Sequence, residues 1–94
     1  KQLADNLKQA ITTTILDPDI TDGPAAGSSG NPGAASASNF WKSVHGIMGT
    51  STYADLQGKL KYGTGGITYS ISSTKAVAIS VDYTSDNDYD FTVE

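Results

Sequence analysis

Apolar side chains occupy every second position in two runs near the end of the chain: Ile67, Tyr69 and Ile71, and then Val77, Ile79, Val81 and Tyr83. Small or polar residues fill most of the positions between them, and a turn-like stretch at 73–75 separates the runs. Because successive side chains of a strand point to opposite faces, a period of two predicts strands that bury one face only. Two such strands joined by a short turn pair antiparallel.

Shorter alternating stretches flank these runs. Leu60 and Tyr62 alternate with lysines before a Gly-rich turn at 63–66, and an acidic loop at 82–88 leads into Tyr89, Phe91 and Val93. We therefore expect an antiparallel sheet of three or four strands over residues 59–94. A sheet with one apolar face needs an apolar cover.

Residues 1–16 supply that cover as an amphipathic helix. Their apolar side chains recur at spacings of three and four, which forms one stripe: Leu3, Leu7, Ala10, Ile11, Thr14 and Ile15. The helix ends before Pro18, because the residue preceding a proline is driven out of the helical backbone region. No Ser, Thr, Asp or Asn precedes Leu3 as an N-cap, so we expect this segment to be the lower half of a longer helix.

The middle of the chain divides into a loop and two short helical segments. Residues 17–39 hold all three prolines and a Gly/Ser-rich run, and we expect a long, exposed loop. Residues 40–58 contain a cluster of large apolar side chains ending near Gly46 or Gly49, and then a turn capped by Ser51 or Thr52. The whole is one α+β domain over residues 1–94, with the N-terminal helix packed on the sheet.

Composition limits the functions open to such a domain. The formal net charge is −4, with 6 Lys and no Arg, so neither nucleic acid nor an anionic membrane surface is an expected partner. There is no Cys, which excludes disulfides and thiolate metal sites. The low charged fraction, 17%, and the abundance of Ser, Thr, Gly, Ala and Asn are typical of an exported protein.

The order of these elements, and the stretch from Gly66 to Val81 with its Ser/Thr-rich alternation, resemble the globular part of type IV pilins and of type II secretion pseudopilins. The resemblance implies a structural filament subunit that polymerises and is not an enzyme. Its partners would be copies of itself or other pilin subunits, on the cell surface or in the periplasm. It would touch the membrane only through a hydrophobic half-helix upstream. The disulfide loop of many type IV pilins is missing here.

One acidic cluster is a candidate metal site. Asp82, Asp86, Asp88 and Asp90, together with Asn87, place four carboxylates and an amide within nine residues. Hard oxygen ligands suit Ca²⁺, and the resemblance implies the same ion, because some pseudopilins bind calcium in a loop of the sheet. The competing interpretation is a solvated turn, since Asp and Asn favour turns. A second acidic run, at 17–22, opens like an EF-hand loop but lacks its Gly and its final Glu, so a helix-ending turn is expected there.

Two aromatic or titratable features remain. His45 is the single histidine and no nucleophile motif accompanies it, so we expect a partly exposed helix residue without a catalytic role. Trp41 and the tyrosines favour core packing, with a small exported module that recognises carbohydrate or protein through them as the alternative function.

Overall fold

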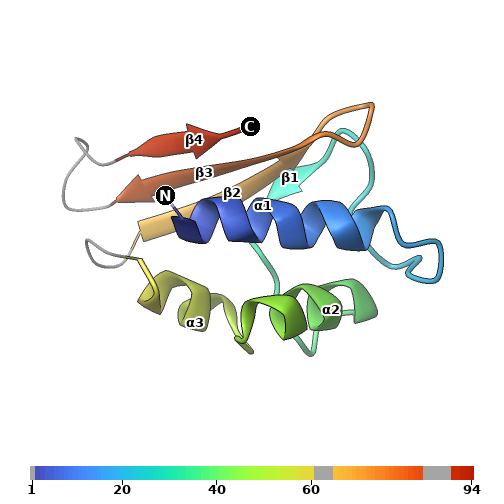
Figure 1. Ribbon diagram of the computed structural model, residues 1–94, viewed down its shortest axis with the longest axis horizontal. Helices are drawn as coiled ribbons and strands as arrows, with labels where there is room; N and C mark the ends of the chain where they lie inside the picture. The colour runs from blue at the N-terminus through green and yellow to red at the C-terminus, as the bar shows by residue number, and fades with distance from the viewer. Residues whose placement is uncertain (1, 61–64, 84–89) are drawn as a thin grey trace.

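The computed structural model describes residues 2–60, 65–83 and 90–94. Three helices lie on one side of a four-stranded antiparallel sheet with the strand order β1-β2-β3-β4, and α1 contacts both the sheet and α2 (Figure 1). This arrangement confirms the predicted α+β fold, an N-terminal helix on an antiparallel sheet. The elements are α1 (Gln2–Ile15), β1 (Ser29–Gly30), α2 (Asn39–Met48), α3 (Tyr53–Gly58), β2 (Gly65–Ile71), β3 (Val77–Tyr83) and β4 (Phe91–Val93).

The two periodicities of the sequence produce the core. The predicted stripe of α1 faces the sheet, with Leu7 and Ile11 completely buried and Leu3 and Ile15 partly buried beside them. The alternating apolar residues of β2 and β3 lie on the same side and are all buried. The residues between them form the outer face of the sheet, where Thr68 and Ser70 are exposed. In the register of β2 and β3, Ile67 pairs with Val81, so the apolar residues of the two strands lie on the same face of the sheet.

The first strand is not the predicted one. Leu60 is buried but lies outside any strand, and residues 61 and 62 of the predicted strand lie outside the described residues. The strand beside β2 instead comes from the loop, where β1 pairs Ser29 with Ser70 and Gly30 with Tyr69. β1 is only two residues long, and further along β2 the Tyr53 hydroxyl of α3 accepts a hydrogen bond from the Ile67 N–H (2.9 Å). A side chain thus replaces a strand at this edge.

Residues 17–39 form the predicted long loop, which is exposed along much of its length and is also fastened to the domain at several points. The Asp22 carboxylate accepts hydrogen bonds from the backbone N–H groups of Asn39 (2.8 Å) and Phe40 (2.9 Å) at the start of α2, where an anion is favoured. Farther along, Pro32 is buried, and Gly33 lies so close to Trp41 that a Cβ on it would meet the indole Cδ1 at 2.8 Å. The loop is therefore part of the packed structure.

The two short helices have the predicted ends. Gly49 closes α2 in the left-handed conformation (φ 72°), and Thr52 caps α3, accepting from the Asp55 N–H. The Asp55 carboxylate accepts in return from the N–H groups of Ser51 and Thr52, which completes a capping box. These backbone hydrogen bonds hold the pKa of Asp55 below its usual value.

Candidate functional site

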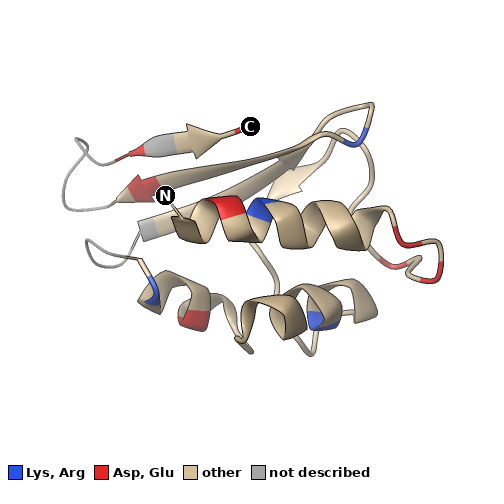
Figure 2. Cartoon of the chain, in the orientation of Figure 1, with Lys and Arg blue, Asp and Glu red and all other residues tan. Residues whose placement is uncertain are grey.

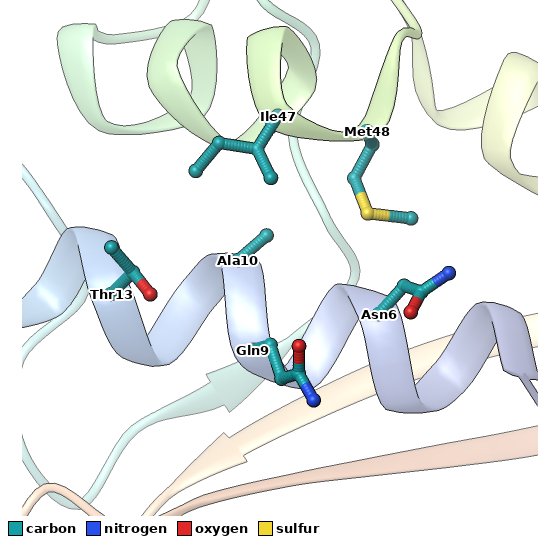
Figure 3. A pocket seen from close by; sticks show the side chains of 6 residues that line it. All are labelled: Asn6, Gln9, Ala10, Thr13, Ile47 and Met48. Carbon is teal, nitrogen blue, oxygen red and sulfur yellow. The ribbon is translucent and has the colours of Figure 1, made fainter.

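A groove of about 350 Å³ separates the exposed side of α1 from the end of α2 (Figure 3). Ile47 and Met48 point from α2 toward α1, and Ala10 points toward them from α1. Ala10 is buried, with 1% of its surface accessible, where the two helices are in contact. Six residues line the groove: Asn6, Gln9, Ala10, Thr13, Ile47 and Met48.

Ile47 lies on the wall of the groove, and Leu16 follows the end of α1. They are the large hydrophobic residues that stand out as exposed in the described part of the chain, with 55% and 65% of their surface accessible. Ile47 belongs to the predicted cluster of large apolar residues in the segment 40–58, and the structure leaves it exposed on the wall of the groove. Leu16 follows the last residue of α1, and its N–H still donates to the Thr12 carbonyl (3.3 Å), so it extends the helical geometry.

None of the six lining residues carries a charge. Acidic residues gather instead in the loop after α1 and at the end of the sheet where β3 leads toward β4 (Figure 2). The groove offers amide, hydroxyl and aliphatic groups, which suit contact with another uncharged protein surface. None of its six lining residues is a carboxylate, a histidine or a lysine.

Comparison of the chain with protein-family models, with curated proteins and with solved structures found no match. The resemblance to pilins therefore stays a prediction from the sequence. None of the helices in the described residues is both long enough and apolar enough to cross a membrane.

Two of the four predicted calcium ligands are described, and they lie close together. Asp82 is exposed near the end of β3, and Asp90 directly precedes β4. The Asp90 carboxylate accepts a hydrogen bond from the Tyr83 N–H (2.7 Å). The negative charge of Asp90 raises the pKa of Asp82, and a hydrogen bond between the two carboxyl groups adds to this effect. Asp86 and Asp88 lie outside the described residues, and within the described ones no three acidic or histidine side chains converge on a metal position. Calcium binding stays a prediction.

Calcium should raise the melting temperature of the protein if this loop binds it. A carboxyl whose pKa is raised by folding stabilises the native state below its unfolded pKa and loses that contribution as the pH rises through its folded pKa. At neutral pH both Asp82 and Asp90 are charged, and the two charges repel each other. A bound dication offsets that repulsion and stabilises the native state by mass action. Thermal melting at pH 7 with and without millimolar calcium measures the effect.

Asp90→Asn is the matched control, because asparagine keeps an oxygen that can accept from Tyr83 but removes the charge. We expect this variant to melt at or slightly above the wild-type temperature without calcium, and to respond less to calcium. An unchanged wild-type melting temperature in calcium would end the metal prediction.

The structure confirms the turn that was expected at the other acidic run, residues 17–22. Asp17 accepts a hydrogen bond from the Asp19 N–H (2.9 Å), while Asp22 accepts one from the Asn39 N–H at the start of α2. These carboxylates therefore stabilise backbone structure at two different places.

His45 is buried, with 1% of its surface accessible, which corrects the prediction of a partly exposed residue. Its Nε2 faces the Gly33 carbonyl, and its Nδ1 lies 2.6 Å from the Thr50 hydroxyl. Because a carbonyl only accepts, the partners assign the proton to Nε2, and Nδ1 accepts from Thr50 in the neutral ring. Both ring nitrogens have partners within the fold, so His45 connects the loop to α2.

The aromatic residues of the alternative binding function lie mainly in the core. Trp41 has 8% of its surface accessible and packs edge-on against Phe40, with ring centroids 4.9 Å apart. Tyr69 and Tyr83 are buried as well, and the hydroxyl of the half-buried Tyr53 bonds to β2. Tyr62 and Tyr89 lie outside the described residues. Trp41 therefore has no free face on which a sugar ring could stack.

Proposed function

We propose that this chain is a structural subunit of a bacterial surface filament, a type IV pilus or a related pseudopilus, and that it acts by polymerisation. The observation that carries the proposal is the N-terminal helix: one side of α1 is buried on the sheet, while its other side stays exposed beside an uncharged groove. A helix that covers a sheet and still presents a second contact surface is suited to packing against other subunits.

Electrostatics supports the same surface as the contact between subunits. A chain with a formal net charge of −4 repels its own copies, and the repulsion is smallest where the charges are farthest away. The six residues that line the groove are uncharged, and Asp5 and Lys8, which flank Asn6 and Gln9 in α1, have opposite signs. Copies of the chain or similar subunits are its partners in this proposal, at the cell surface or in the periplasm.

Two observations on the producing cell test this function. The gene should encode a short basic leader and about 20–25 apolar residues directly upstream of Lys1, enough for a membrane-anchored helix. Immunogold electron microscopy with an antibody against this domain should label surface filaments, and deletion of the gene should remove the label. An unrelated domain upstream, or an ordinary cleaved signal peptide, would contradict the proposal.

A further inference from the structure

We infer that the Asp22–Gly23 pair is a site of spontaneous covalent modification, the isomerisation of aspartate to isoaspartate, and that the start of α2 controls its rate. An Asp-Gly pair occurs once in the chain, and an Asn-Gly pair, which reacts in a similar way, does not occur in it. The reaction needs only water. It is therefore a property of this domain that does not depend on the proposed function.

The reaction joins groups of two neighbouring residues. The Gly23 amide nitrogen loses its proton and attacks Cγ of the Asp22 carboxyl group, one oxygen of that group leaves as water, and a five-membered succinimide ring closes. Water then opens the ring at either carbonyl, so no atom is gained or lost overall. Opening at the original main-chain carbonyl sends the main chain through Cβ and Cγ of Asp22, which is isoaspartate. Glycine favours the attack because no Cβ stands beside its nitrogen.

In the folded protein both oxygens of the Asp22 carboxylate are bound at the start of α2. One accepts a hydrogen bond from the Asn39 N–H (2.8 Å) and the other from the Phe40 N–H (2.9 Å). An oxygen can leave as water only after its hydrogen bond to α2 has broken. Asp22 and Gly23 are exposed, so water reaches them. Attachment of the loop to α2 therefore slows the reaction, and local opening of the loop permits it.

The product does not fit the place that the aspartate occupies. A Cβ on Gly23 would lie 2.6 Å from Cδ1 of the buried Phe40 ring, so the backbone passes close to that ring. Isoaspartate lengthens the main chain by one carbon at this point and leaves the free carboxylate directly on Cα. Asp22 and Gly23 then cannot both keep their contacts with α2. Isomerisation therefore detaches this part of the loop and distinguishes aged copies of the chain from new ones.

Asn39→Pro tests the control by α2, because it removes one of the two N–H donors. Asn39 is the first residue of α2, where proline is well tolerated, and Ser38 before it already has the extended backbone that a following proline requires (φ −164°, ψ 167°). The matched control is Asn39→Ala, which keeps the N–H. Loss of a hydrogen bond to a carboxylate should raise the population of the open loop, and with it the rate of isoaspartate formation, roughly tenfold.

Isoaspartate is measured after the pure proteins have been incubated at neutral pH. Isoaspartyl methyltransferase with labelled S-adenosylmethionine transfers a methyl group to the new carboxylate, and mass spectrometry of the digested chain locates the label. We expect the label at Asp22, accumulating faster in Asn39→Pro than in Asn39→Ala. Asp22→Glu is the blank, because glutamate would have to form a six-membered ring, which closes far more slowly. No label is expected at position 22 in that variant.

Equal rates of labelling in Asn39→Pro and Asn39→Ala would show that α2 does not control the reaction and would overturn the inference. Wild-type protein kept unfolded in guanidinium provides a second test that does not depend on the folding of the proline variant. Its loop is detached, so Asp22 should be labelled faster than in the folded wild type, and absence of the label there would also overturn the inference. Filaments on cells are a separate measurement, so neither result changes the standing of the proposed function.

Discussion

Gly33→Ala is expected to destabilise the protein by roughly 1–3 kcal/mol, although it adds a single methyl group. The new Cβ would lie 2.8 Å from the Cδ1 and 3.0 Å from the Nε1 of Trp41, closer than packed carbon atoms approach. The indole cannot retreat, because it packs against Phe40 on one side and Tyr69 on another. The backbone cannot retreat without weakening the hydrogen bond between the Gly33 carbonyl and His45. Chemical denaturation, read as the change in unfolding free energy, measures the effect.

Gly46→Ala is the matched control for this substitution. Gly46 lies inside α2, and a Cβ there would meet no atom within 4 Å. Alanine is the better helix former by about 1 kcal/mol, so the control variant should be stabilised. The same chemical change thus has opposite expected signs at the two positions. A loss of stability at Gly46, or none at Gly33, would contradict the packing described here.

The regular elements could be predicted because their signals are local. The spacing of Leu7 and Ile11 defines a buried stripe whatever lies across from it, and the alternation around Tyr69 defines a half-buried strand. β1 could not be predicted in the same way. Ser29 and Gly30 have no periodicity and become a strand only because β2 presents an unpaired edge to them.

The fastening of the loop also depends on residues far apart in the sequence. Asp22 lies 17 residues before the Asn39 N–H that it binds, and His45 lies 12 residues after Gly33. Isolated Asp, Gly and His residues carry no pattern that pairs them. Their composition predicts a surface loop, while hydrogen bonds and close ring contacts incorporate the segment into the domain.

The exposure of Leu16 can be predicted from the sequence, whereas the groove cannot. Leu16 falls outside the apolar stripe of α1, and an apolar residue away from the buried face is a signal of exposure. The groove itself arises from the sizes of the side chains where α1 and α2 meet, with Ala10 facing Ile47 and Met48. That meeting is a property of the tertiary structure, and neither helix predicts it alone.

His45→Ala is expected to cost roughly 3 kcal/mol of unfolding free energy, from two causes of similar size. Removal of a buried ring leaves a cavity between the loop and α2. It also leaves the Gly33 carbonyl and the Thr50 hydroxyl without their partner in a place that water reaches poorly. His45→Phe retains most of the volume and loses only the hydrogen bonds, so about half of the loss should remain. Equal stability of His45→Ala and the wild type would contradict the assigned role.

A double-mutant cycle identifies the segment that His45 holds. His45→Ala and Gly33→Ala both release the same stretch of loop, the first by removing the hydrogen bond and the second by forcing the backbone away from Trp41. Once one substitution has detached the loop around Gly33, the second substitution has fewer remaining contacts to remove. The combined loss should therefore fall short of the sum by about 0.5 kcal/mol or more, the range found for residues that share a partner. Additive losses would show that the histidine and the glycine act on separate parts of the structure, and the loop would then need another explanation for its order.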